Sequence, residues 1–453
     1  MKRRSFLKRA AVASAATTCQ FLPDYAVGKT EKNDKVNLAI IGCSHRGGGI
    51  GEEAMKSGMA NCVALCDVVP SRANRFKSKY KDARYFDDFR NMFDTMSDKI
   101  DACTIGTPDH SHFPIAILAM SMGKHVFVEK PLAHTFEECE LLKAAEKKYN
   151  VCCQMGNQGQ SSSQRLQFKT WVEAGIIKNV RRIDAWMNGS RRWHPWGDVQ
   201  GFPPGQSQPE GMNWDVWAGT APKRPYSSKY DNGDWRGWHD YGTGAMGDWG
   251  AHILDSLHRF LQLGLPHEIR VEKLEGRNDF IYPMASTIVF EFAARGPGMP
   301  ATTLNWYDGR ENKPPCPPEL DKERYDSLRG VGKFLFSDDL VFHGGRKGDH
   351  LRIIPHETMQ EMRSRLPDIP EPDTSTHHMH NFLRAVRRED PRCNSPFEVA
   401  APLTQLFTLG CIAQRLGGTL KLDTDEKEIT NNARANQLLN PPPRKDWEAF
   451  YRL

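Results

Sequence analysis

A short apolar segment at residues 36–41 runs directly into the glycine-rich stretch Gly42-Cys43-Ser44-His45-Arg46-Gly47. An uninterrupted apolar run of this length predicts a strand that is buried on both faces, as the strands of parallel sheets are. A glycine immediately after the strand permits a tight turn into a following helix. This unit restricts the fold more than any other feature of the chain, because it opens a doubly wound α/β domain.

Strand-like and helix-like segments alternate after this unit. Predicted strands follow at residues 62–67, 102–107, 124–129 and 151–155, and predicted helices at 71–79, 114–122 and 135–148. The alternation predicts a Rossmann-type doubly wound parallel sheet over residues 35–155. Residues 156–453 are richer in Gly, Pro and aromatic residues, and we expect an α+β domain there, with a mainly antiparallel open sheet. Its predicted strands are 180–186, 268–275, 286–293 and 301–306, and its predicted helices lie near 251–263 and 378–388.

Basic residues are concentrated at the N-terminus. Residues 1–28 hold five cations and one carboxylate, which account for +4 of the formal net charge of +5 and leave +1 for the remainder. The nearly neutral remainder argues against nucleic acid as a partner. Lys2-Arg3-Arg4-Ser5-Phe6-Leu7-Lys8 resembles a twin-arginine export signal, which we place at residues 1–30. We therefore expect passage through the twin-arginine translocase and a periplasmic or secreted protein without a membrane anchor.

The glycine-rich stretch has the spacing G-x-G-x-x-G of a dinucleotide-binding turn, with Ser44 in place of the second glycine. In such a turn the first amides of the helix face a pyrophosphate. The predicted contacts are Gly42, Ser44, His45, Arg46 and Gly47. Asp67 ends the next strand, where a dinucleotide site has an acid for the adenosine ribose hydroxyls. A carboxylate there favours NAD over NADP, although Arg72 is close enough in sequence to leave NADP open.

Two more polar segments follow predicted strands at the edge where doubly wound sheets bind ligands. One runs from Thr107-Pro108 to His112, and the other is Glu129-Lys130-Pro131. Taken singly, the first is a helix cap and the second a polar turn. Their places after successive strands make a nucleotide site the better interpretation.

With these motifs the chain resembles the Gfo/Idh/MocA family, named for glucose-fructose oxidoreductase and inositol dehydrogenase. The shared pattern is the glycine turn, Thr-Pro-x-x-x-His, Glu-Lys-Pro and, at residues 248–255, Asp-x-x-x-His-x-x-Asp. Ser44 departs from it. The resemblance implies an NAD(P)-dependent oxidoreductase that forms a homodimer or tetramer. It also implies a reacting centre of Lys130, Asp248 and His252, with further cofactor contacts from Thr107, Pro108, His112 and Glu129.

The residue types in the last motif suit the oxidation of a secondary alcohol. Asp248, His252 and Asp255 are spaced at i, i+4 and i+7, which predicts one face of one helix. A neutral imidazole can take the hydroxyl proton, so His252 is the expected base, and Asp248 would orient it or bind a neighbouring hydroxyl. Lys130 would stabilise the developing alkoxide. We expect no metal, because neither Asp248 with His252 nor the histidines at 377–380 have a convincing third ligand.

Eight of the 11 tryptophans lie between Trp186 and Trp249. Flat apolar rings beside polar groups suit the faces of a carbohydrate, and Asp234-Trp235-Arg236 offers both. We therefore add Trp235 and Arg236 to Lys130, Asp248 and His252 as the expected substrate contacts. Aromatic residues also cover long loops and subunit contacts, so both uses stay open for the rest of this stretch.

Three functions fit these features. The first is an exported NAD(P)-dependent oxidoreductase that acts on a secondary hydroxyl of a sugar or glycoside and keeps its nicotinamide tightly bound. The second is an NAD-dependent glycosidase or sugar lyase that works by transient oxidation and elimination. The resemblance extends to exported N-acetylgalactosaminidases of that kind, although the retained Lys130 argues against this subgroup. The third is a non-catalytic sugar-binding protein, against which the joint presence of Lys130, Asp248 and His252 argues.

Overall fold

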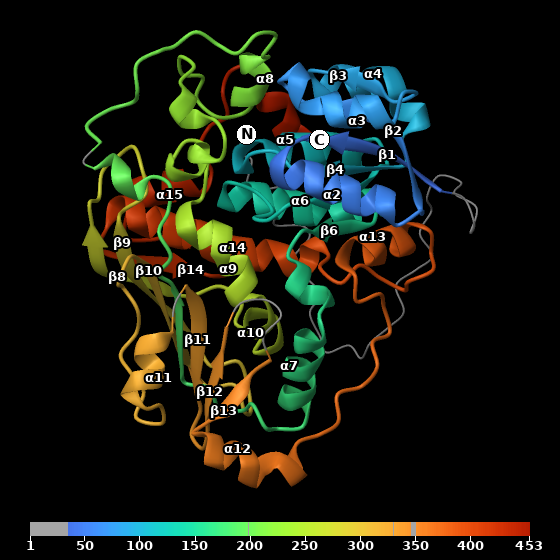
Figure 1. Ribbon diagram of the computed structural model, residues 1–453. Helices are drawn as coiled ribbons and strands as arrows, with labels where there is room; N and C mark the ends of the chain where they lie inside the picture. The colour runs from blue at the N-terminus through green and yellow to red at the C-terminus, as the bar shows by residue number, and fades with distance from the viewer. Residues whose placement is uncertain (1–34, 198, 329, 346–349) are drawn as a thin grey trace.

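The computed structural model describes residues 35–453 apart from 198, 329 and 346–349. The expected export signal, residues 1–30, lies outside the described residues. Two sheets organise the described chain (Figure 1): a six-stranded sheet formed by its N-terminal part and a nine-stranded sheet formed by the remainder. The N-terminal Rossmann-type sheet and the second, mainly antiparallel sheet confirm the predicted fold class.

The first sheet has the strand order β3-β2-β1-β4-β5-β6, and all of its neighbouring strands pair in parallel. Its strands are β1 (Val36–Ile41), β2 (Ala60–Cys66), β3 (Arg84–Phe86), β4 (Ala102–Ile105), β5 (His125–Val128) and β6 (Cys153–Met155). The order reverses between β1 and β4, so the turns after these two strands open a crevice at the carboxyl edge of the sheet. Doubly wound sheets bind their ligands in such a crevice.

Five helices connect these strands: α2 (His45–Lys56), α3 (Asn74–Lys79), α4 (Phe89–Met96), α5 (Asp109–Ser121) and α6 (Phe136–Tyr149). A capping box fixes the start of α6, because Thr135 accepts the amide of Glu138 while the Glu138 carboxylate accepts the amide of Thr135. Helix α5 is buried along nearly its whole length. It therefore serves as core for both the parallel sheet and the segments packed above it.

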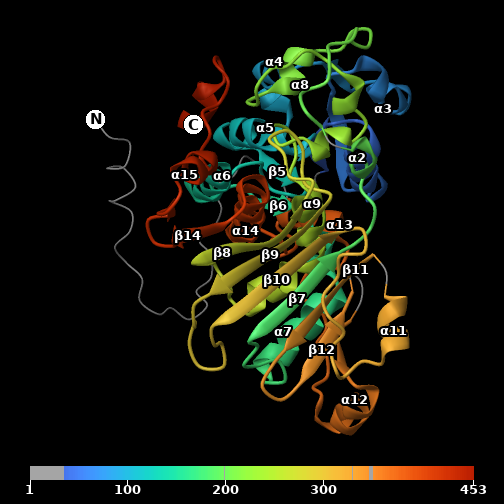
Figure 2. The ribbon, with the colours of Figure 1, turned by 90° about the vertical axis from the view of Figure 1, so that its left-hand side faces the viewer.

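The second sheet has the order β13-β12-β11-β7-β10-β9-β8-β14-β15. Its neighbours pair antiparallel except β7 and β10, which are parallel. The strands are β7 (Arg182–Met187), β8 (Glu268–Glu275), β9 (Ala285–Phe292), β10 (Thr302–Gly309), β11 (Val331–Phe336), β12 (Val341–Gly344), β13 (Arg352–Ile354), β14 (Thr419–Asp423) and β15 (Glu428–Ile429). In Figure 2, strands β8, β9, β10 and β7 face the viewer.

The helices of this part are α7 (Ser163–Glu173), α8 (Trp214–Ala218), α9 (Gly244–Ile253), α10 (Asp255–Phe260), α11 (Lys322–Ser327), α12 (His356–Met362), α13 (His378–Val386), α14 (Phe397–Leu416) and α15 (Ala433–Leu439). Helix α14 is buried along most of its length and packs against α6, α9, β8 and β9. It therefore lies between the two sheets and joins their cores. None of the described helices combines the length and apolar character that crossing a bilayer requires.

The prediction of one helix over residues 251–263 was wrong. The helix ends at Ile253 and a second one begins at Asp255, with Leu254 between them. The Lys333 ammonium donates to the Ile253 carbonyl at 2.9 Å, which gives this carbonyl a partner outside the helix at the break. Asp255 consequently does not share one continuous helix with Asp248 and His252. Its pKa is raised by burial, which nearby Lys333 partly opposes.

The C-terminal residues 440–453 pack on the first domain. Phe450 lies 5.9 Å from Phe89 between ring centroids, and Tyr451 lies 4.6 Å from Phe113 on α5.

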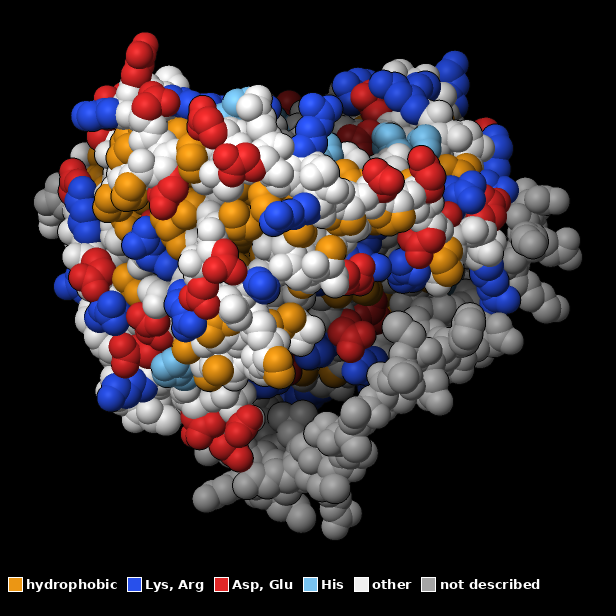
Figure 3. Space-filling model, turned by 90° about the horizontal axis from the view of Figure 1, so that it is seen from below, with side chains coloured by type: hydrophobic (Ala, Val, Ile, Leu, Met, Phe, Trp, Pro, Cys, Tyr) orange, Lys and Arg blue, Asp and Glu red, His pale blue; other side chains and the backbone are white. Residues whose placement is uncertain are grey.

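Seen from below, cationic and anionic side chains are interspersed on the part of the surface that the described residues form (Figure 3). The ten cysteines in the described range all have free thiols.

We predict that stability declines in acid through His110, which links the two parts of the chain. Its ring lies 2.6 Å from the Trp217 carbonyl and 3.1 Å from the Tyr241 carbonyl. Burial lowers its pKa to about 4. Between its ordinary value of about 6.5 and this value, the unfolded chain binds the proton and the folded chain does not. The free energy of unfolding is therefore highest above pH 6.5. It falls by on the order of 3 kcal/mol as the pH is lowered from about 6.5 to about 4.

Urea unfolding at a series of pH values measures this loss. The variant His110→Gln should show a shallower decline between pH 6.5 and 4 than the parent protein, because glutamine does not titrate. Equal slopes for the two proteins would assign the acid sensitivity to other groups.

Candidate active site

Three glycines bring the turns after β1 and β4 into direct backbone contact. A Cβ on Gly47 would lie 2.5 Å from the carbonyl oxygens of both Gly42 and Gly106, and a Cβ on Gly106 would lie 2.3 Å from the Gly47 Cα. Gly42 also has a φ of +85°, which L side chains rarely adopt. The Ser44 side chain forms no capping hydrogen bond at the start of α2. The free amides of this turn therefore suit a phosphate group.

The other predicted residues of the turn point in different directions. The exposed His45 has a φ of +46°, and its Nδ1 lies 3.2 Å from the Ser44 hydroxyl. Arg46 donates from Nε to Glu129 at 2.8 Å and from Nη1 to Glu53 at 2.8 Å. The ion pair with Glu129 ties the first turn of α2 to the segment that follows β5. Arg46 and Glu129 thus belong to the same corner of the crevice.

Asp67 accepts two backbone amides at the end of β2. Its Oδ2 accepts from Cys43 at 2.9 Å and its Oδ1 from Val69 at 3.0 Å. Burial raises its pKa, and the two amides oppose the rise. Each oxygen keeps a lone pair, so the carboxylate can still accept ribose hydroxyls. Arg72 forms an ion pair with Asp231 of the second part of the chain, and this contact occupies its charge.

The segment after β4 contains a buried polar atom without a partner. The Thr107 hydroxyl oxygen is buried and has no hydrogen-bond partner among the described residues. Pro108 precedes the first turn of α5. The His112 ring lies 2.9 Å from the Thr107 carbonyl and 2.8 Å from the Pro131 carbonyl, and burial lowers its pKa. His112 therefore holds the Thr-Pro and Glu-Lys-Pro segments together.

Asp248 on α9 is surrounded by three cations. Lys130 Nζ lies 2.5 Å from its Oδ1, Arg191 pairs with its Oδ2, and Arg236 Nε lies 3.6 Å from Oδ1. The three basic side chains are 12%, 14% and 18% exposed. Burial by itself raises the pKa of the Asp248 carboxyl, but the charges of Arg236, Lys130 and Arg191 outweigh it and hold the pKa far below its usual value. Asp248 is therefore a carboxylate throughout the physiological range.

His252 lies one helical turn after Asp248 on the same helix α9 and is partly buried. Its ring is 5.8 Å from the Trp249 ring between centroids. The structure thus joins the Lys130 ammonium to the predicted orienting acid Asp248, and the predicted base His252 lies one turn further along the same helix. The described side chains contain no group of three His, Cys, Asp or Glu that could hold a metal ion.

Two residues of this cluster were missing from the sequence-based site. Arg191 follows β7 and reaches Asp248, and its Nε is buried with no partner among the described residues. Asp109 accepts from Arg236 at 3.2 Å and from the Thr243 hydroxyl at 2.5 Å, just before α9. The Arg-Arg-Trp-His sequence at 191–194 carried a signal for Arg191. Asp109 gave none, because an acid after Thr-Pro also fits an ordinary helix start.

Most of the tryptophan-rich stretch forms core. Five of the eight tryptophans are buried: Trp186, Trp193, Trp214, Trp217 and Trp238. Trp214 and Trp217 stack at 4.3 Å within a cluster that also holds Tyr230 and Tyr241. The predicted substrate contact Trp235 is partly buried, and the Arg236 guanidinium lies over its ring at 4.3 Å. Arg236 therefore connects an accessible ring to the Asp248 cluster.

Comparison with known families accounts for most of the chain. Residues 36–157 match the model described as "Oxidoreductase family, NAD-binding Rossmann fold", and residues 164–289 with 336–449 match "Oxidoreductase family, C-terminal alpha/beta domain". The chain belongs to the Gfo/Idh/MocA oxidoreductase family. The Rossmann part of this family member is accordingly an NAD-binding domain, and a nicotinamide cofactor fits its three-glycine turn and unpartnered Thr107 hydroxyl.

Curated relatives align with part of this Gfo/Idh/MocA chain. A glycosyl hydrolase family 109 protein of Shewanella sp. (strain ANA-3) is 33% identical over 180 residues, which cover 34% of this chain and 39% of the relative. A second, from Shewanella baltica (strain OS155), is 29% identical over 215 residues, covering 42% and 47%. The chain thus spans less than half the length of these relatives.

Solved structures share the fold at low identity. Aldose-aldose oxidoreductase from Caulobacter crescentus, complexed with glycerol, has a TM-score of 0.56 at 16% identity, covering 86% of this chain and 100% of that one. The WlbA dehydrogenase from Bordetella pertussis, in complex with NADH and UDP-GlcNAcA, has a TM-score of 0.58 at 16% identity, covering 86% and 98%. The two-domain arrangement is therefore the one found in these enzymes.

The glycine contact predicts a sharp difference between two alanine substitutions in α2. Gly47→Ala would place a Cβ 2.5 Å from two carbonyl oxygens, whereas a Cβ on Gly49 would meet only Arg46 Nη1 at 3.8 Å. Overpacking of this kind costs about 1–3 kcal/mol, so we expect at least tenfold weaker NAD binding for Gly47→Ala. Gly49→Ala is the matched control and should bind like the parent. Titration calorimetry measures the affinity of each variant for NAD. Equal affinities of Gly47→Ala and Gly49→Ala would contradict the assignment of residues 42–47 as the dinucleotide-binding turn.

Proposed function

We propose that this family member is an exported NAD-dependent oxidoreductase that acts on a secondary hydroxyl of a sugar or glycoside. The observation that carries the proposal is the Lys130–Asp248 ion pair at 2.5 Å, with His252 one turn further along α9. These groups lie where the Glu-Lys-Pro segment of an NAD-binding domain meets the second domain. An ammonium, a permanent carboxylate and an imidazole are the set that alcohol oxidation requires.

Each residue has a distinct part in this proposal. The bound nicotinamide dinucleotide supplies the hydride acceptor, held by the glycine turn, Asp67 and Thr107. His252 takes the proton of the substrate hydroxyl. Lys130 places its positive charge beside the oxygen as negative charge develops there. Asp248 cannot serve as the base, because its neighbouring cations hold its pKa far below neutral. It fixes Lys130 and accepts a hydrogen bond from a neighbouring substrate hydroxyl.

The preference for NAD over NADP rests on Asp67. Its carboxylate would repel a 2′-phosphate, and Arg72, the nearby cation that could offset this, is paired with Asp231.

Export is supported by the twin-arginine sequence of the leader. In a compartment that does not resupply nicotinamide, a cofactor loaded before export has to stay bound. We further propose that the protein forms a homodimer or tetramer, as the family resemblance implies.

A second candidate function, glycoside cleavage through transient oxidation, is supported by the curated relatives named as glycosyl hydrolase family 109 proteins. The same three residues would serve it, because the first step is again oxidation of a hydroxyl. Incubation with an aryl glycoside in deuterated water separates the two functions. The favoured proposal gives a reduced cofactor and a keto-glycoside whose glycosidic bond is intact, whereas cleavage gives released aglycone and deuterium beside the carbon that was transiently oxidised.

The first test of the proposal is the cofactor content of the protein. After purification without added nucleotide, mass spectrometry of the denatured supernatant should detect NAD or NADH. A glycoside screen then follows the absorbance change of the bound cofactor. A nucleotide-free preparation that also fails to bind added NAD would contradict the proposal.

Substitution of the reacting residues should lower turnover with the cofactor still bound. We expect His252→Asn and Lys130→Met each to reduce kcat by about 10²–10⁴-fold, the usual contribution of a positioned acid–base group. Lys147→Met is the control, because this lysine is 67% exposed on α6. Steady-state turnover gives kcat, and single-turnover measurements of bound-cofactor reduction give the rate constant of the oxidation step itself. Unchanged turnover in both active-site variants would exclude this catalytic assignment.

A further inference from the structure

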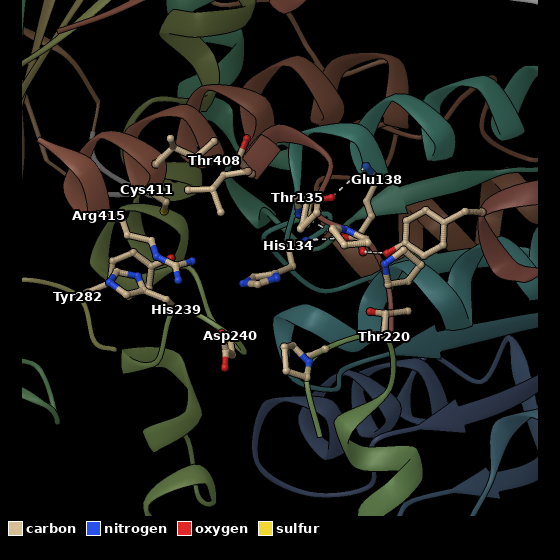
Figure 4. Close-up of a pocket in the computed structure, with 18 residues that line it drawn as sticks. His134, Thr135, Glu138, Thr220, His239, Asp240, Tyr282, Thr408, Cys411 and Arg415 are labelled. Atoms are coloured by element: carbon tan, nitrogen blue, oxygen red, sulfur yellow. Dashed lines mark hydrogen bonds between the residues drawn. The ribbon is translucent and has the colours of Figure 1, made fainter. Parts of the chain in front are cut away.

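A cavity of about 160 Å³ lies away from the Asp248 cluster, between the start of α6, the second half of α14 and the C-terminal tail (Figure 4). Its walls come from five short segments, 134–138, 220–222, 239–240, 408–415 and 438–443, together with Tyr282 and Tyr451. The lining does not include Asp248 or the residues paired around it, Lys130, Arg191, Arg236 and Asp109. The proposed oxidation therefore leaves this cavity without a role.

The cavity contains one charge without a partner. The Arg415 Nε is buried and forms no hydrogen bond, and its guanidinium forms no ion pair within the described part of the chain. Figure 4 places Arg415 beside Tyr282 and His239 on one side, with His134 nearer the middle. Arg415 is partly buried, so its guanidinium loses part of its hydration without gaining a partner, which costs free energy. A bound anion would remove this cost.

The other polar groups of the wall are already satisfied. Asp240 is paired with Arg224 at 2.6 Å. The Glu138 carboxylate accepts two backbone amides at the start of α6 and the Tyr451 hydroxyl at 2.6 Å. Burial, and then the charge of Arg415, lower the pKa of His239 to about 3, so its ring is neutral at pH 7. The two carboxylates therefore have their own donors, and Arg415 remains as the unbalanced charge of the wall.

The shape and lining of the cavity indicate what kind of anion fits. A guanidinium fork matches the two oxygens of a carboxylate. The lining also contains apolar side chains, which include Ile412, Leu438 and the three prolines at 441–443. A cavity of about 150 Å³ holds a molecule of the size of benzene. We infer that this cavity is a second ligand site, which binds a small organic carboxylate through Arg415.

The wall is connected to the helix that carries the reacting residues. The Gly242 carbonyl accepts both from His134 Nε2, at 3.1 Å, and from the Tyr282 hydroxyl, at 2.9 Å. The Cys411 thiol donates to the Thr243 carbonyl at 3.3 Å. Gly242 and Thr243 lead directly into α9. A ligand that contacts these wall residues therefore acts on the segment that positions Asp248, which makes the site suited to an effector.

Titration calorimetry on the full chain with its cofactor tests the inference without any measurement of turnover. The probes are benzoate, succinate, the neutral isostere benzamide and inorganic phosphate. We expect benzoate or succinate to bind the parent protein, with benzamide and phosphate at least tenfold weaker. Arg415→Gln should weaken carboxylate binding at least tenfold, and Arg415→Lys, which keeps the charge but loses the fork, should fall between.

Arg277→Gln is the matched control, because Arg277 is exposed, does not line the cavity and donates to the backbone carbonyls of Arg415 and Leu416, leaving the Arg415 guanidinium untouched. It should bind carboxylates like the parent. Melting temperatures establish that each variant is folded. The inference is overturned if neither carboxylate binds the parent, if Arg415→Gln binds as well as Arg277→Gln, or if phosphate binds as tightly as the carboxylates. Each outcome is independent of the proposed oxidoreductase activity.

Discussion

The Asp248 carboxylate is the interaction on which the two-domain site depends. Its cations come from three separate places: Lys130 from the Rossmann domain, Arg191 from the end of β7 and Arg236 from the loop before α9. A buried carboxylate is tolerable only when its charge is matched. The same network continues through Arg236 to Asp109 on α5. The position of α9 relative to the parallel sheet is therefore set by charge pairing as well as by packing.

The glycine contact supplies the other half of the site. Because Gly42, Gly47 and Gly106 touch through their backbones, the turns after β1 and β4 lie close enough to form one crevice. Arg46 and Glu129 then tie α2 to the Glu-Lys-Pro segment. The glycine turn that would bind the cofactor is in this way connected to the Lys130 ammonium. The contacts run from Arg46 to Glu129, and from the next residue, Lys130, to Asp248 on α9.

Helix α14 and the C-terminal tail explain why the domains form one body. Helix α14 is apolar on nearly all sides and packs against both α6 and the nine-stranded sheet. The tail adds aromatic contacts to the first domain through Phe450 and Tyr451. The cavity around Arg415 is bounded by these late segments together with the start of α6. Such a space depends on segments that are far apart in sequence, and local patterns carry no sign of it.

The sequence by itself determined the doubly wound sheet and most of its strands, because apolar runs, glycine turns and polar strand ends are local signals. It missed β3 and α4, which are short or amphipathic, and it merged α9 with α10 because spacing alone cannot reveal that Lys333 takes the Ile253 carbonyl. Only the tertiary structure decided that most tryptophans of the stretch are core, that Asp248 has three cationic neighbours and that the Arg415 Nε has no hydrogen-bond partner within the described chain. Burial and charge pairing are properties of distant residues brought together, and these two effects decide what each ionisable side chain can do.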